Sequence, residues 1–304
     1  MRFLSEAETS ALVTRGLALD AAREALIAAA SDGAIFPAVI GHGADPANRF
    51  SVKSGVVAGT AGAKIGSYWP GNAAKGLPRH SSIILLFDEA TGRIDTVVEA
   101  SKANAFRTAA ANAVAADALA RANAKTLAVF GAGHQAFYEV LALAEVRPVA
   151  QVLVVARTAE SAAGLIDRLA DAGIAAARAE PQDACAAADM IVTVTPSRTP
   201  LFEADWVKPG TYIGAMGADG PGKQELPPAL LRRAALFCDL PRQSLALGEF
   251  QSVAAEGLTV TAIGSVLLGE HSGRRSPDEV CIFDSSGIAL QDLALARRLV
   301  RAAG

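Results

Sequence analysis

Residues 126–136 read TLAVFGAGHQA, and this stretch decides the fold of the chain. Its first half, residues 127–130, is a short continuous apolar run, which suits a strand buried on both faces of a parallel sheet. The glycine turn that follows has the form G-x-G-x-x-A, and an apolar helical pattern begins directly after it. Strand, glycine turn and helix in this order form a dinucleotide-binding fingerprint.

Each small residue of this turn has a reason to be there if the turn binds a dinucleotide. Gly131 permits the tight turn, Gly133 leaves room for a pyrophosphate to approach the backbone, and Ala136 lets the helix pack close to the strand. The helix N-terminus presents free N–H groups and the positive end of its dipole to the phosphates. A purely structural glycine turn is the alternative. The sequence predicts contacts to the coenzyme from Gly131, Ala132, Gly133, His134 and Gln135.

Length and composition argue against several classes of protein. The 304 residues suffice for two domains, and 51% of them are hydrophobic, so a large core can form without disulfides. A formal net charge of -3 argues against nucleic-acid binding. Three separated cysteines indicate a reducing compartment, and the four histidines show no metal-ligand spacing. Because no apolar run could span a membrane and the N-terminus lacks the apolar core of a signal peptide, we expect a soluble cytoplasmic protein.

Two regions of different pattern follow one another along the chain. Residues 36–100 hold short β-like runs separated by glycine, with a hairpin turn at 88–92, and predict an antiparallel meander. Beyond a helical stretch, strands and helices alternate as in a doubly wound domain. We expect an α/β fold with a Rossmann dinucleotide-binding domain over residues 119–287. Residues 1–118, joined by the final helix in 288–304, form an α+β substrate-binding and dimerisation domain.

The second Rossmann strand, residues 152–155, ends beside an unusual residue. A carboxylate in this place usually holds the ribose hydroxyls of NAD. Here the segment reads Ala156-Arg157-Thr158, so a guanidinium replaces the carboxylate. Arg157 can bind a 2′-phosphate, which mildly favours NADP, or it can stack on adenine or be solvated. The expected coenzyme is NAD(P)H, with further contacts from Thr108, Thr158 and Thr195.

Three other residues are candidates for chemistry. Lys64 leads an apolar strand, where a lysine is either catalytic or an edge residue whose ammonium reaches solvent. Arg107 starts an alanine-rich helix, where a guanidinium holds a carboxylate or forms a surface ion pair. Asp219 lies in a glycine-rich loop after a Rossmann strand, where it transfers a proton to or from a substrate nitrogen or stabilises the loop. From the residues alone, both interpretations of each stay open.

Six stretches, in order along the chain, resemble the ornithine cyclodeaminase/mu-crystallin family. They are KIGSYWPGN (64–72), GLPRHSSIILLFD (76–88), FRTAAANAVAADALA (106–120), FGAGHQA (130–136), GADGPGKQEL (217–226) and FDSSGIALQDLALA (283–296). The resemblance implies a nicotinamide-dependent activity at a carbon–nitrogen bond, as in cyclodeaminases, alanine dehydrogenases and ketimine reductases. It implies that Lys64 lies near the reacting carbon, that Arg107 holds the α-carboxylate, and that Asp219 is the acid/base.

The chain departs from the family pattern in residues 36–42, which lack the arginine that many members carry there. Cations follow later, at Arg49, Lys53, Arg79 and His80. This arrangement resembles the iminosuccinate reductase branch of the family more than its ornithine branch. A four-carbon dicarboxylate needs a second cation besides the one that holds its α-carboxylate, because desolvating an unpaired carboxylate costs several kcal/mol.

We therefore expect an NAD(P)H-dependent imine reductase that forms an amino acid, by preference aspartate from iminosuccinate. Catalytic roles are expected for Lys64 and Asp219, and substrate binding for Arg107, Lys53, Arg49, Arg79 and His80. The alternatives are an ornithine cyclodeaminase, an alanine dehydrogenase-like enzyme, and a mu-crystallin-like ligand-binding protein. An apolar sheet with little helical cover nearby in sequence predicts a symmetric homodimer.

Overall fold

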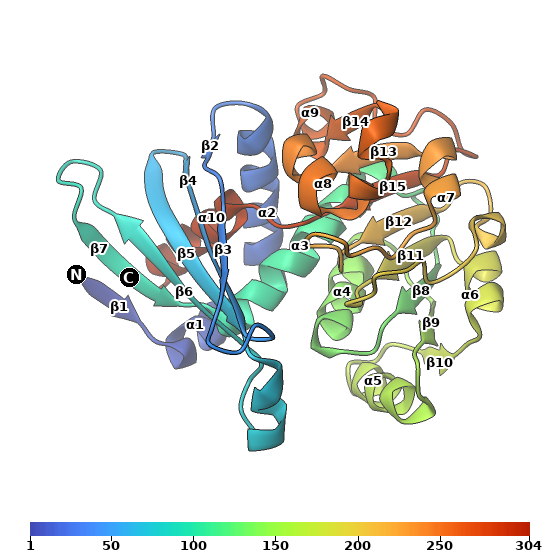
Figure 1. Ribbon diagram of the computed structural model, residues 1–304, viewed down its shortest axis with the longest axis horizontal. Coiled ribbons are helices and arrows are strands. Elements are labelled where there is room, and N and C mark those ends of the chain that lie inside the picture. Colours follow the sequence, from blue (N-terminus) through green and yellow to red (C-terminus); the bar gives the residue numbers. More distant parts are fainter. The chain divides into compact units, whose positions relative to one another are not determined.

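The computed structural model describes residues 1–304 and divides the chain into two compact units, shown in Figure 1. The first comprises Met1–Thr108 and Ile288–Gly304, and the second comprises Ala109–Gly287. The expected boundary at residue 118 and the observed division lie in the same helix, α3 (Ser101–Leu119).

The first unit is built on a seven-stranded sheet. Its strands are β1 (Arg2–Leu4), β2 (Ala34–Ile35), β3 (Val39–His42), β4 (Arg49–Val57), β5 (Thr60–Tyr68), β6 (His80–Phe87) and β7 (Ile94–Glu99). Strands β4 to β7 form the antiparallel meander that the sequence predicted. β1 pairs in parallel with β7, while β2 and β3 both pair with β4. Between β6 and β7, Asp88 accepts hydrogen bonds from Ala90 and Thr91 and fixes the predicted turn.

Helices distant in sequence cover one face of this sheet. α10 (Ala289–Ala302) packs on β4, β5 and β6 and against α2 (Arg15–Ala30), and it lies in red among the blue and cyan strands of Figure 1. Glycines make this close approach possible. A Cβ at Gly62 would lie 2.6 Å from Leu293 Cδ2, and a Cβ at Gly55 would lie 2.9 Å from Leu290 Cδ2. The helical cover of the meander therefore comes from the C-terminal end of the chain, which the local sequence did not reveal.

The opposite face of the same sheet carries exposed apolar side chains. The register pairs Val39 with Val52, Val52 with Ile65, and Ile65 with Ile83, so these four residues share one face. Val39 is 60% exposed and Ile65 is 40% exposed. Phe50, on the same face of β4, is 36% exposed. We call these five residues the open face; such contiguous apolar surface is typical of an interaction site.

The second unit is a parallel eight-stranded sheet in the order β10-β9-β8-β11-β12-β15-β13-β14. The strands are β8 (Thr126–Phe130), β9 (Gln151–Val155), β10 (Ala176–Arg178), β11 (Met190–Thr193), β12 (Tyr212–Ala215), β13 (Ala235–Cys238), β14 (Val260–Ala262) and β15 (Cys281–Asp284). The connecting helices include α4 (His134–Val146), α5 (Ala159–Asp171), α6 (Pro181–Ala187), α7 (Pro228–Arg233), α8 (Pro241–Leu247) and α9 (Ile263–Leu267). The predicted Rossmann fold is confirmed, and strand order reverses between β8 and β11, where such sheets bind ligands at their carboxyl edge.

The apolar run of residues 127–130 is buried, as its pattern predicts. Leu127, Ala128 and Val129 are fully buried in β8, as a central parallel strand requires.

The three cysteines are free and buried, and no group of histidine, cysteine or acidic side chains could hold a metal ion. None of the helices combines the length and apolarity that a membrane crossing needs.

Candidate active site

The glycine turn has the shape of a pyrophosphate cradle. Gly131 has φ +113°, where L side chains are strained, and a Cβ there would lie 2.9 Å from the carbonyl oxygen of Val194. A Cβ at Gly133 would meet no atom within 4 Å, so the space beside this backbone is open. α4 begins at His134 with no side-chain cap on its N–H groups, and Ala136 is fully buried beneath the turn. Free N–H groups, open space and a glycine-only turn fit a dinucleotide.

The segment after β9 offers a free guanidinium. Arg157 is exposed, and its guanidinium takes part in no hydrogen bond or ion pair. Thr158 caps α5, because its Oγ1 accepts a hydrogen bond from the backbone N–H of Ser161 at 3.2 Å. Thr108, in the first unit, donates its hydroxyl to the Asn104 carbonyl at 2.8 Å. Thr158 and Thr108 are thus engaged within the protein, whereas the N–H groups of Arg157 remain available to a ligand.

A buried carboxylate that sequence reasoning missed ties two loops together at the carboxyl edge of the sheet. Glu225 accepts hydrogen bonds from the Thr193 hydroxyl at 2.8 Å and from the Gly217 N–H at 2.9 Å. It also accepts from the N–H and hydroxyl of Thr195, at 2.6 and 2.7 Å. Burial raises the pKa of Glu225 and raises that of its neighbour Glu249 to about 8. The expected coenzyme residue Thr195 is therefore held by the same group that anchors the start of the next loop.

That next loop carries Asp219. Its side chain is 60% exposed and forms an ion pair with Lys223, four residues further on. The Lys223 ammonium also donates to the Gly217 carbonyl at 3.2 Å. Asp219 is thus an accessible carboxylate on a loop that is anchored at its base, and accessibility is one requirement of a proton-transfer group.

In the first unit, cations gather on the sheet face that α10 covers. Lys64 on β5 lies directly opposite Lys53 on β4 in the register. Lys64 is 7% exposed, so it is a buried residue and not a solvated edge residue. Its Nζ donates to Asp292 Oδ1 at 2.8 Å and makes a short hydrogen bond to Asn104 Oδ1.

Arg107 joins the same cluster from α3. Its Nε lies 3.0 Å from Asp292 Oδ1, and its side chain is 12% exposed. Nη1 donates to Gln291 Oε1 at 3.2 Å, and Nη2 donates to Asn104 Oδ1 at 2.8 Å. Each Nη carries two N–H groups, so one on each remains for a bidentate carboxylate. The structure thus brings Arg107 and Lys64 to one carboxylate and excludes a surface ion pair for Arg107.

The electrostatics of the cluster favour proton exchange near neutrality. Burial, and then the charge of Arg107, lower the pKa of Lys64, while Asp292 opposes both effects; together they bring this pKa to about 7. Although burial disfavours its charge, Arg107 and Lys64 hold the pKa of Asp292 below its ordinary value. The cluster therefore combines a carboxylate that stays ionised, Asp292, with an ammonium, Lys64, that can release its proton at physiological pH.

The remaining candidates lie further along the strands. Arg49 pairs with Tyr68, and Tyr68 pairs with His80, whose ring lies 4.7 Å from the tyrosine ring. Four residues of strand, about 13 Å, separate Arg49 from Lys53. Arg79 is exposed just before β6. The structure thus places Lys53 beside Lys64, and the other three at one end of the sheet.

Three polar partners of the cluster escaped sequence reasoning. Asn104, Gln291 and Asp292 contact Lys64 or Arg107, and the last two are polar residues inside a completely buried stretch, residues 288–296. A polar pair in such an apolar helical run was a usable signal, because buried polar groups need partners.

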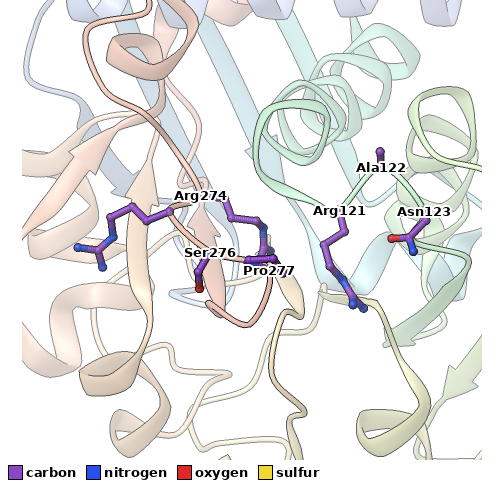
Figure 2. A pocket seen from close by; sticks show the side chains of 7 residues that line it. Arg121, Ala122, Asn123, Arg274, Ser276 and Pro277 are labelled. Atoms are coloured by element: carbon purple, nitrogen blue, oxygen red, sulfur yellow. The ribbon is translucent and has the colours of Figure 1, made fainter.

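A shallow depression in the second unit is a separate feature. Figure 2 shows its lining residues, which are Arg121, Ala122, Asn123, Arg274, Arg275, Ser276 and Pro277. Arg121 is ion-paired with Asp189 at 2.9 Å, and Arg275 with Glu279 at 2.6 Å. Arg121 precedes β8, so the depression borders the amino edge of the sheet, whereas coenzymes bind at the carboxyl edge.

Known proteins resemble this chain over its whole length. A sequence model of the ornithine cyclodeaminase/mu-crystallin family matches residues 4–303. An iminosuccinate reductase of Paracoccus denitrificans is 39% identical over 311 residues, which cover 100% of this chain and 97% of that protein.

Solved structures agree with this assignment. The iminosuccinate reductase of Paracoccus denitrificans in complex with NAD+ has a TM-score of 0.94 at 37% identity, and an archaeal alanine dehydrogenase dimer with bound NAD has a TM-score of 0.94 at 33% identity. Each comparison covers 100% of this chain and 96% of the other. The resemblance carried by the six motifs is confirmed, and the chain belongs to the ornithine cyclodeaminase/mu-crystallin family.

Proposed function

We propose that the chain is a nicotinamide-dependent imine reductase that forms an amino acid, and that its preferred substrate is iminosuccinate, which yields aspartate. The charge of the cluster around Lys64 carries this proposal. Lys53 lies beside Lys64 in the register, and Lys64 and Arg107 both contact Asp292, so three cations gather on this face of the sheet. A dicarboxylate supplies two negative charges.

The same cluster suits ornithine poorly. An ornithine substrate needs an anion for its distal ammonium, but Asp292 is already ion-paired with both Lys64 and Arg107 and its side chain is 2% exposed. The similarity to an iminosuccinate reductase over the full chain supports the same choice of substrate.

Each of four residues has a distinct role in reduction of the imine. Arg107 holds the α-carboxylate through its two terminal nitrogens, and Lys53 neutralises the distal carboxylate. Lys64, as an ammonium, polarises the reacting centre, and Asp219 delivers the proton that the substrate nitrogen takes up. A nicotinamide held by the second unit would supply the hydride for the imine carbon. One hydride on carbon and one proton on nitrogen convert the imine to the amine.

The coenzyme would be held by the second unit. The turn at Gly131 and Gly133 and the uncapped start of α4 receive the pyrophosphate, while Arg157 gives a 2′-phosphate a charged partner. The buried free cysteines support a reducing compartment such as the cytoplasm.

We also infer that a second copy of the chain covers the open face of the first sheet. Val39, Phe50 and Ile65 are exposed there, and the related archaeal alanine dehydrogenase is a dimer. A self-complementary sheet face suits a symmetric homodimer.

The test is coenzyme consumption with oxaloacetate plus ammonia, which form iminosuccinate in solution, and with pyruvate plus ammonia. Lys53→Ala should lower kcat/KM for the dicarboxylate by about tenfold or more, since losing the partner of a desolvated charge costs about 2 kcal/mol or more. The monocarboxylate should be affected much less. Lys75→Ala, which removes an exposed lysine of the same unit, is the matched control. Proline formation from ornithine, without turnover of oxaloacetate plus ammonia, would refute the substrate assignment.

A further inference from the structure

Asp292 lies between the two cations to which the proposed function assigns polarisation and carboxylate binding. Its Oδ1 is 2.8 Å from Lys64 Nζ and 3.0 Å from Arg107 Nε. Asn104 joins the same two residues from α3, since its Oδ1 accepts hydrogen bonds from both. One carboxylate oxygen and one amide oxygen therefore set the separation and orientation of both cations.

We propose that Asp292 is a positioning residue of this reaction: it holds the Lys64 ammonium and the Arg107 guanidinium in one arrangement toward the substrate. The proposal rests on the proposed function for the roles of these two cations. Asp292 itself acts through them and need not touch the substrate.

Docking of α10 does not explain a carboxylate at this position. Glu24 on α2 already forms ion pairs with α10, to Arg298 at 3.0 Å and more closely to Arg297. The neighbouring residues of α10 are buried, and a buried ion pair is by itself weak evidence of a stabilising role. The charge of Asp292 is instead explained by the cations that it contacts.

The groups that face Lys64 show why this anion matters. Arg107 approaches from α3 and Lys53 from β4, and both disfavour the ammonium, while Asp292 on α10 favours it by charge and by hydrogen bond. Asn104 contributes a neutral acceptor. Without the carboxylate, like charges would drive Lys64 to the neutral amine near pH 7 and would leave Arg107 Nε without its counter-ion.

The test compares Asp292→Asn, which removes the charge at constant shape, with the wild type. The titration of the Lys64 side chain is followed by NMR in the whole protein without coenzyme or substrate. The Lys64 pKa should fall by about one unit or more in Asp292→Asn. In turnover, the decline of kcat/KM at rising pH should move to lower pH by the same amount, and KM for oxaloacetate plus ammonia should rise about tenfold.

Two further variants make the result decisive. Glu24→Gln removes the ion pairs of Glu24 with Arg297 and Arg298 of α10 and should leave the Lys64 pKa unchanged. Asp292→Glu restores the charge one methylene further out, so it should return the pKa toward 7 but keep a raised KM, and it serves as the test if Asp292→Asn does not fold. An unaltered Lys64 titration in Asp292→Asn, an equal shift in Glu24→Gln, or a wild-type KM in Asp292→Glu overturns the proposal. Because the titration needs no substrate, a wrong substrate assignment would leave its outcome intact.

Discussion

At the scale of single residues, burial decides what the charged groups of this enzyme family member can do. Lys64 loses most of its hydration, and its pKa falls to about 7, so the same side chain is charged on one side of neutrality and neutral on the other. The guanidinium beside it differs in kind, because this group is not deprotonated in proteins. Under the proposed function, Lys64 can therefore exchange a proton while the neighbouring Arg107 would hold the α-carboxylate.

Arg157 carries the prediction for coenzyme choice. Arg157→Asp should weaken NADPH binding about tenfold or more, because it removes a charge-assisted hydrogen bond worth about 1.5–3 kcal/mol and adds repulsion. NADH binding should improve or stay constant, since a carboxylate here accepts from ribose hydroxyls. Titration calorimetry with both coenzymes measures the change. Arg178→Asp, on the exposed end of β10, controls for net charge, and equal affinities in wild type and Arg157→Asp would show that Arg157 does not contact the coenzyme.

At the scale of elements, the first sheet is shaped to receive α10. Gly55 and Gly62 are directly paired on β4 and β5, and side chains at either place would collide with leucines of α10. On the same face, the next register pair is Lys53 with Lys64. The glycines therefore let the helix approach closely enough for Asp292 to reach the lysine.

Gly62→Ala should destabilise the protein by roughly 1–3 kcal/mol, the cost of overpacking a filled site. Its Cβ would lie 2.5 Å from the Leu85 carbonyl oxygen and 2.6 Å from Leu293 Cδ2. Gly66→Ala on the same strand is the matched control, because its Cβ would come no closer than 3.6 Å to another residue. Urea unfolding of both variants measures the difference. Equal stability of the two would mean that α10 does not depend on the glycine at residue 62.

At the scale of the whole molecule, the two faces of the first sheet have different partners. One face is filled by helices of the same chain, while the open face keeps apolar residues in solvent. Such surface is normally covered, and a second copy of the chain is the partner that we propose.

Ile65→Lys should therefore convert the homodimer to a monomer, because it places a charge in the middle of the buried interface. Light scattering at micromolar concentration measures the molar mass of the variant and of the wild type in solution. Leu268→Lys is the matched control, since Leu268 lies in the second unit and is 40% exposed, as is Ile65. A wild-type protein that is monomeric under these conditions would disprove the assembly.

The sequence by itself determined the Rossmann unit, the meander and the family. Each depends on residues that are neighbours in the chain: the glycine turn of residues 131–136 requires its strand before and its helix after, and hairpins follow from short runs and turns. Lys64, Arg107 and Asp219 were singled out from motifs of the same local kind.

Only the tertiary structure decided which groups these residues contact and how deeply they are buried. Asp292 reaches Lys64 across 228 positions of sequence, and the pKa of that lysine depends on the helices that remove it from water. Local patterns cannot report such effects, because desolvation and ion pairing are set by whatever the fold brings into contact. The sheet face that α10 covers and the face left open were settled in the same way, by packing between segments far apart in the chain.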